Sequence, residues 1–330
     1  MIPYQTLIRS KIHGLLKNSL YRKNKNILVV TDSDSLKLMK NKYKFTAAIP
    51  TYNSSKYLKE CIYGLKDSIY LDEILVGDDY SETEELHQIK KIIQEAKKHF
   101  SFDIKLLENY ENTGAFKNKY KLIESAKNDW VYQIDSDNIP FPKIDRVISN
   151  IIEKHNSQIY IYYPAKLIQF WKYKRIVKFF SKIQNKYTIR FVKDYEIFDI
   201  NKTKKAIDEF LNHEATRGGE GSAAINSKFV LDKHIYWVLN CGNFIVNKKQ
   251  FITLMKPGLD FSREILSMDA VAFSYLWLKG YGSIVLHPKL GHFHRKRLDS
   301  VSYVEKDSSK TSRQYFTDKI LSLESKDSKK

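Results

Sequence analysis

Two aspartates separated by one residue follow a short apolar segment near the middle of the chain. Residues 130–134 are mostly apolar, Asp135, Ser136 and Asp137 come next, and Pro140 follows shortly after. Mg²⁺ and Mn²⁺ prefer oxygen ligands and are commonly held by one or two carboxylates together with substrate phosphates. If the segment is a strand of an open α/β sheet, both carboxylates lie at the carboxyl edge, where such folds bind ligands. The alternative is a polar turn that closes the strand.

Alternating apolar and amphipathic segments over residues 45–140 must position these carboxylates. Ser81 and Glu84 have the spacing of a capping box, which places a helix start there. The alternation of strand and helix patterns predicts a parallel sheet with crossover helices. The predicted strands are 45–50, 73–77, 104–107 and 130–134, and the predicted helices are 55–66, 81–99 and 118–127.

Polar residues follow three of the predicted strands. Tyr52 and Asn53 follow the first, Asp78 and Asp79 the second, and the acidic pair the fourth. Because parallel strands share one direction, these positions meet at one edge of the sheet. No Gly-x-Gly-x-x-Gly or Gly-Lys-Ser/Thr motif follows the first strand, which argues against a dinucleotide-binding fold and a P-loop.

Four motifs in this order resemble the signature of family-2 glycosyltransferases with the GT-A fold. The resemblance is strongest over residues 45–140 and continues more weakly to about residue 300. It implies an α/β fold with a Rossmann-like mixed sheet flanked by helices, and a transferase that uses a nucleotide diphosphate sugar. The motifs are residues 47–53, residues 73–81, Asn112-x-Gly114 and Asp135-Ser136-Asp137.

The resemblance implies a donor site built from the first three motifs. Pro50 and Tyr52 would form a wall beside the nucleotide base, and Asp79 would bond the base or the ribose. Asn112 and Gly114 would belong to the loop that receives the donor. For Tyr52 the alternative is an aromatic residue of the core.

The resemblance also implies how the diphosphate is held. Lys119 stands where the family often has arginine, so it keeps a cation for the phosphates but loses the bidentate fork. Its alternative is a solvated position on a helix. Asp135 would lie by the ribose or a metal-bound water, and Asp137 would ligate the Mn²⁺ or Mg²⁺ that bridges the donor diphosphate.

The later half supplies a candidate base and further candidate ligands. Asp269 begins a helical pattern that resembles the family's acidic helix start, and we predict it as the general base that takes the acceptor hydroxyl's proton. The alternative is a carboxylate that stabilises the helix dipole. His292 and His294 point the same way on a strand, so both can reach one site. The resemblance suggests that one of them completes the metal shell, and Arg295 or Arg297 would stabilise the leaving diphosphate.

Four parts organise the chain, and its charge constrains their partners. There are 56 Lys+Arg against 38 Asp+Glu, a formal net charge of +18. Phosphate-bearing substrates and an anionic membrane surface both suit this charge. The lysines are scattered, so we expect no specific nucleic acid. The predicted parts are a basic amphipathic extension (1–44), a nucleotide-sugar-binding half (45–140), an acceptor-binding half (141–300) and a polar tail (301–330).

Cysteine usage and hydropathy predict a location. Cys61 and Cys241 give no disulfide framework. No segment approaches the roughly 18 to 20 apolar residues of a membrane span, and the start lacks a signal-peptide pattern. We therefore expect the cytoplasm, with the protein either unattached or peripheral on the inner face of the cell membrane.

The resemblance implies a metal-dependent inverting glycosyltransferase. It also favours a UDP-sugar as donor and, as acceptor, a hydroxyl of a glycan or a lipid-linked glycan in the synthesis of a bacterial capsule or lipopolysaccharide. One alternative is a nucleotidyltransferase of similar fold, although its glycine-rich phosphate loop is missing. The other is a basic protein that binds nucleic acid or membrane surfaces, whose binding would survive the loss of Asp137 and depend steeply on salt.

Overall fold

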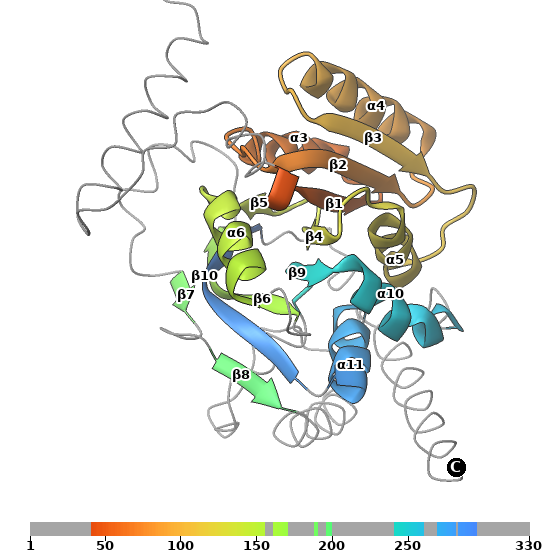
Figure 1. The fold of residues 1–330 in the computed structure, drawn as a ribbon. Helices are drawn as coiled ribbons and strands as arrows, with labels where there is room; N and C mark the ends of the chain where they lie inside the picture. Colours follow the sequence, from red (N-terminus) through yellow and green to blue (C-terminus); the bar gives the residue numbers. More distant parts are fainter. Residues whose placement is uncertain are drawn as a thin grey trace, which may run out of the picture. The chain divides into compact units, whose positions relative to one another are not determined.

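The computed structural model describes residues 41–155, 161–170, 188–190, 196–199, 241–260, 269–281 and 283–295 (Figure 1). From Tyr43 onward they belong to one compact unit. Residues 1–40 of the predicted amphipathic extension and the predicted polar tail (301–330) lie outside the described residues. Within the described ranges, no helix has the length and apolar character that a membrane span requires.

The ten strands that the structure describes form one mixed sheet, which confirms the predicted fold class. They are β1 (Phe45–Thr51), β2 (Leu71–Asp78), β3 (Asp103–Glu108), β4 (Trp130–Gln133), β5 (Ile139–Pro140), β6 (Tyr162–Phe170), β7 (Thr188–Arg190), β8 (Glu196–Asp199), β9 (Phe244–Asn247) and β10 (Ser283–Arg295). Their order is β3-β2-β1-β4-β9-β6-β10-β5, with β7 beside β6 and β8 beside β10. Strands β1 to β4 pair in parallel, as the alternation predicted, whereas β9 runs antiparallel to β4.

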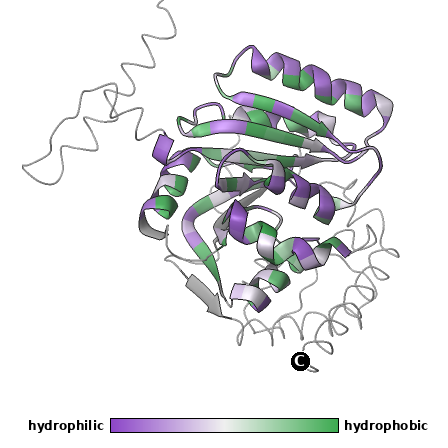
Figure 2. Cartoon of the chain, turned by 45° about the vertical axis from the view of Figure 1, so that its right-hand side comes forward, coloured by the Kyte–Doolittle hydropathy of each residue, from purple (hydrophilic) through white to green (hydrophobic). Residues whose placement is uncertain are grey.

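Helices cover both faces of this sheet. They are α3 (Ser55–Gly64), α4 (Thr83–Lys97), α5 (Ala115–Ser125), α6 (Ile144–His155), α10 (Lys248–Met255) and α11 (Asp269–Tyr281), with a 3-10 helix η1 (Lys256–Asp260) after α10. Side chains of α3, α4 and α6 pack in one apolar cluster with Ala47 and Ile49 of β1, while α5, α10 and α11 pack in another with Ala48. The two clusters lie on opposite faces because successive side chains of a strand alternate. Figure 2 shows hydrophobic residues along the strands and alternating hydrophobic and hydrophilic residues along α4.

The turn after β2 differs from its prediction. The predicted capping box of Ser81 and Glu84 is wrong, because α4 begins at Thr83 without a side-chain cap. Ser81 instead donates its backbone N–H and its hydroxyl to Asp78, at 3.0 and 2.5 Å. Tyr80 adopts a left-handed conformation with φ 67° inside this turn. Serine thus closes the turn at the strand end, a role that serine also favours.

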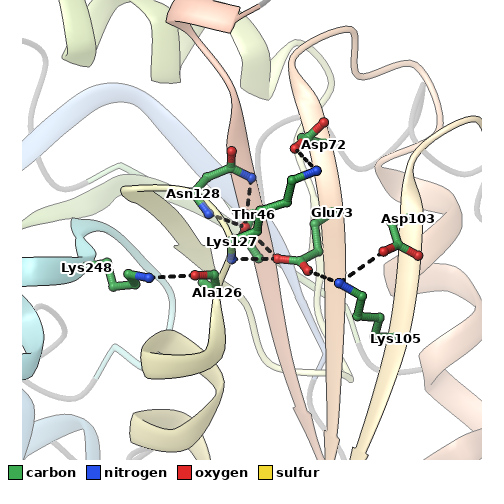
Figure 3. Close-up of polar contacts among 9 residues, drawn as sticks. All are labelled: Thr46, Asp72, Glu73, Asp103, Lys105, Ala126, Lys127, Asn128 and Lys248. Atoms are coloured by element: carbon green, nitrogen blue, oxygen red, sulfur yellow. Dashed lines mark hydrogen bonds and ion pairs between the residues drawn. The ribbon is translucent and has the colours of Figure 1, made fainter.

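A polar cluster ties the amino ends of the strands together, at the edge opposite the carboxyl ends (Figure 3). The buried carboxylate of Glu73 accepts hydrogen bonds from the Thr46 hydroxyl at 3.0 Å, Lys105 Nζ at 2.9 Å and the Lys127 backbone N–H at 2.8 Å. A buried charge is tolerated when it is paired and hydrogen-bonded. This cluster therefore joins β1, β2 and β3 to the segment that enters β4.

Candidate functional site

The acidic loop, residues 135–137, follows β4 at the carboxyl edge of the sheet. The backbone N–H of Asp135 donates to the side-chain carbonyl of Asn243 at 2.8 Å. The Ser136 hydroxyl forms a hydrogen bond with that of Ser54 at 2.8 Å, which links the loop to the turn after β1. These bonds fix the loop's backbone, so its conformation is set before any ligand arrives. Asp137 is half-buried at its end.

Lys119 of α5 joins the acidic loop to α11. Its ammonium nitrogen Nζ lies 2.8 Å from Asp135 Oδ1 and 2.7 Å from Asp269 Oδ2. Lys119 is only 5% exposed and Asp269 only 7%, so the predicted solvated position of Lys119 is wrong. Burial opposes the charged form of Lys119, but the two carboxylates outweigh it and raise its pKa. Burial would raise the pKa of Asp135, and the Lys119 ammonium outweighs that effect and lowers it. All three groups are brought together by elements far apart in the sequence.

Gly242 lies directly against this ion pair. A Cβ atom at position 242 would stand 2.5 Å from Asp135 Oδ2 and 2.9 Å from Lys119 Nζ. Such distances are too short for non-bonded atoms. A glycine is therefore required for the backbone to approach the two charged groups this closely.

Asp79 organises the loop that precedes α5. Its carboxylate accepts hydrogen bonds from the backbone N–H groups of Thr113 at 2.9 Å and Gly114 at 2.8 Å, from the Thr113 hydroxyl at 2.8 Å and from Asn109 Nδ2 at 2.9 Å. Asn112 Oδ1 also accepts from the Gly114 N–H at 3.1 Å. Gly114 has φ 84°, a left-handed conformation that favours glycine. The structure thus shows how the loop is shaped, and the implied bond from Asp79 to the base or ribose stays a prediction.

The residues predicted as the nucleotide wall are Pro50, near the end of β1, and Tyr52, directly after it. Tyr52 is 45% exposed, so its interpretation as a core aromatic residue is wrong. Pro50 is half-buried and pairs in register with Gly77 of β2. The next residue, Asn53, has φ 46° and donates its N–H to the Ser81 hydroxyl, which turns the chain sharply after Tyr52. An exposed aromatic ring at this edge can stack on a planar base.

His292 and His294 lie close together, with ring centroids 5.7 Å apart, as their spacing on a strand predicted. His292 is buried, and its Nε2 lies 3.0 Å from Asn243 Nδ2. Since the Asn243 carbonyl already accepts from Asp135, its amide group donates to His292, whose Nε2 is the acceptor. Burial and the charge of His294 lower the pKa of His292 to about 3. His292 is thus a neutral hydrogen-bond acceptor, whereas His294 is half-buried and its role as a metal ligand stays a prediction.

Arg295 holds the acidic loop from its other side. Its Nε donates to the backbone carbonyl of Asp137 at 3.1 Å, and its Nη2 lies 2.6 Å from Glu60 Oε2 on α3. The guanidinium also stacks over the Tyr57 ring at 4.6 Å. In this arrangement Arg295 faces the loop and α3, so the predicted role on the leaving diphosphate is not what its contacts indicate. Arg297 lies outside the described residues.

The contacts of three residues that support this site were not predicted from sequence. Gly242 and Asn243 belong to residues 240–247, which resemble the family's glycine-containing strand that lines the site, and Glu60 is one polar position on a helix. Each acts through a contact with a residue more than 70 positions away. No local pattern contains such a signal.

A partial ligand set for a divalent cation is present. In the part of the chain that the structure describes, no three His, Cys, Asp or Glu side chains converge as a metal site. Mg²⁺ and Mn²⁺ often use one or two protein carboxylates and take their other ligands from water and substrate phosphates. Asp137 and His294 are both half-buried at the carboxyl edge, and their role as metal ligands stays a prediction.

Comparisons with known proteins identify the family. A family model described as "Glycosyl transferase family 2" matches residues 46–214, about half of the chain. The SPbeta prophage-derived glycosyltransferase SunS of Bacillus subtilis strain 168 is 30% identical over 131 residues, which are 35% of this chain and 29% of that protein. An uncharacterized glycosyltransferase of Haemophilus influenzae is 24% identical over 119 residues, 36% of this chain and 37% of that protein.

Solved structures are similar at a lower level. The crystal structure of S. aureus TarS 1–349 in complex with UDP-GlcNAc has a TM-score of 0.47 and 15% identity, and the match covers 79% of this chain and 61% of that chain. The matches to the curated relatives span less than two fifths of those proteins. The extent of the family match is decisive: the chain belongs to glycosyl transferase family 2.

Proposed function

We propose that this protein transfers a sugar from a nucleotide diphosphate sugar, with UDP as the nucleotide, to a hydroxyl acceptor with inversion at the anomeric carbon. The observation that carries the proposal is the contact of Lys119 with both Asp135 and Asp269. Asp269, the predicted base, thus lies near the acidic loop and a cation, which supports the proposal. Such an arrangement suits the departure of an anionic diphosphate near a group that accepts a proton.

The residues divide the reaction between them. Lys119 occupies Oδ2 of Asp269, so Oδ1 is the oxygen that would take the acceptor proton. The acceptor oxygen then forms a bond with the anomeric carbon while the bond to the diphosphate breaks, and the diphosphate leaves with the electron pair. Attack from the face opposite the leaving group inverts the centre. Asp137 and His294 would hold the divalent cation, Mn²⁺ or Mg²⁺, which supplies electrostatic stabilisation of the leaving diphosphate when bound.

Donor binding is tested by thermal unfolding with a panel of nucleoside diphosphates, with and without Mn²⁺. A ligand that binds the folded state stabilises it by about 2.7 kcal/mol at one hundred times its Kd. We expect one nucleotide, UDP first, to raise the unfolding temperature of the wild type only when Mn²⁺ is present. Asp137→Ala should abolish the shift.

Asp129→Ala is the matched control, because it removes an exposed carboxylate just before β4. It should keep the metal-dependent shift. No shift for the wild type with any nucleotide would contradict the proposed donor site and favour the interpretation as a basic surface-binding protein.

The acceptor and the pathway are a further part of the proposal. We propose a hydroxyl of a glycan or a lipid-linked glycan in bacterial surface polysaccharide synthesis, as the family resemblance suggests. Incubation of the protein with labelled UDP-sugars and extracted lipid-linked glycans tests this. Label transfer that is lost in Asp269→Asn supports it, and label released only as monosaccharide in every incubation would contradict it.

A further inference from the structure

The Lys119 ammonium group forms ion pairs with two carboxylates that have different predicted roles. Lys119 Nζ is 2.8 Å from Asp135, which belongs to the acidic loop, and 2.7 Å from Asp269, the predicted base on α11. The three groups together carry two negative charges and one positive charge. An ammonium has three N–H donors, so these two carboxylates leave one donor for another anion.

The geometry limits how this group of three can rearrange. Asn243 holds the backbone of Asp135, and the Gly242 backbone lies so close to the Asp135 carboxylate that a Cβ there would stand 2.5 Å from Oδ2. Lys119 is almost fully buried, so water cannot readily take the place of a lost partner. Any anion that approaches the ammonium must therefore share it with Asp135 and Asp269.

The negative diphosphate of a donor would arrive at this same point. Like charges in a buried site repel strongly, because the effective dielectric constant is far below that of water. A phosphate oxygen that accepts a bond from Lys119 would draw the ammonium away from Asp269. In the other direction, the charge of Asp269 holds the ammonium and weakens its bond to the phosphate.

We propose that Lys119 is a positioning residue that couples donor binding to the predicted base, so that the charge of Asp269 lowers donor affinity through its hold on the Lys119 ammonium. The inference rests on the proposed function and deepens it. It assigns Lys119 a task beyond the neutralisation of phosphates. Binding of the donor to the ammonium weakens the hydrogen bond between Lys119 and Asp269.

A double-mutant cycle on nucleotide affinity tests this coupling. The ligand is UDP with Mn²⁺, or the nucleoside diphosphate that stabilises the wild type, measured by calorimetric titration. Asp269→Asn should bind the nucleotide about five-fold more tightly than the wild type. Residues that contact each other commonly show coupling energies of this size. In the Lys119→Gln background the same substitution should change the affinity by less than about two-fold. Glu124→Gln is the control, since it removes an exposed carboxylate from the same helix, α5, and should leave the affinity as in the wild type.

The outcomes separate the two proposals. Equal gains from Asp269→Asn in both backgrounds would mean that Asp269 repels the donor directly, and would overturn the coupling. Absence of nucleotide binding by the wild type would overturn the proposed function and the coupling together. If Lys119→Gln does not fold, ¹⁵N-lysine labelling replaces the cycle: the ammonium signal missing from Lys119→Arg identifies Lys119. In ligand-free Asp269→Asn, the Lys119 signal should be shifted from its position in the ligand-free wild type toward its position in the wild type with UDP bound. A signal that has not shifted would overturn the coupling.

Discussion

A methyl group at position 242 would collide with the ion pair at the centre of the site. In Gly242→Ala the new Cβ would lie 2.5 Å from Asp135 Oδ2 and 2.9 Å from Lys119 Nζ. Non-bonded heavy atoms are comfortable at about 3.5 to 4.0 Å. Because Asn243 holds the Asp135 backbone, the carboxylate itself must shift, by roughly 1 Å on this difference.

Two separate losses follow from that shift. Overpacking a close contact costs about 1–3 kcal/mol of unfolding free energy. A displacement of about 1 Å in a reacting or binding group lowers turnover by roughly 100-fold. We therefore expect Gly242→Ala to fold, with modestly lower stability and a much larger loss of transfer activity and nucleotide affinity.

Urea unfolding, nucleotide titration and transfer rate together test this expectation. Gly258→Ala is the control, since its Cβ would overlap with Phe116 and Leu276, away from the charged residues. It should lose comparable stability and keep its nucleotide affinity. If both variants lose the same stability and Gly242→Ala binds nucleotide like the wild type, the reasoning from the close approach of Gly242 is refuted.

Three further predictions concern residues around the site. Arg295→Lys keeps the charge but loses the planar fork, and calorimetry should show about 10-fold weaker Mn²⁺-dependent nucleotide binding; unchanged binding would contradict its role on the acidic loop. Burial and the charge of His294 lower the pKa of His292 from 6.5 to about 3. The contribution of neutral His292 to the unfolding free energy is therefore fully present above pH 6.5 and is lost as pH falls toward 3. Urea unfolding at pH 7 and pH 5 should show a smaller loss in His292→Gln than in the wild type, and equal losses would refute this. Glu73→Gln weakens the bond to Lys105 and should cost about 1–3 kcal/mol of unfolding free energy without changing nucleotide affinity. Reduced affinity would contradict this and show that the amino edge of the sheet affects the site at its carboxyl edge.

Much of the fold over residues 45–140 follows from local patterns. Short apolar segments alternate with helices that have an apolar face, so sequence alone predicts that β1 to β4 are parallel and at which edge the polar residues gather. The position of Asp135 and Asp137 after β4 follows for the same reason.

The contacts that build the site could not be predicted in this way. Lys119 and Asp269 are 150 residues apart, and Asp135 and Asn243 are 108 apart. Helical or strand periodicity reports which face of an element is apolar, not which distant side chain it will meet. The contact of Arg295 with Glu60 could not be predicted for this reason, since the charge of Arg295 is visible in the sequence but its partner is not.

The position of β9 has a consequence for engineering the enzyme. Strand β9 lies between β4 and β6 in the sheet, although β4 and β9 are far apart in the chain. Gly242 and Asn243, which directly precede β9, therefore contact the acidic loop. A chimaera that takes residues 141–300 from a relative would therefore replace the supports of the donor site along with the acceptor surface. Grafts that retain these two residues, Asp269 and Arg295 are the ones that should recombine productively.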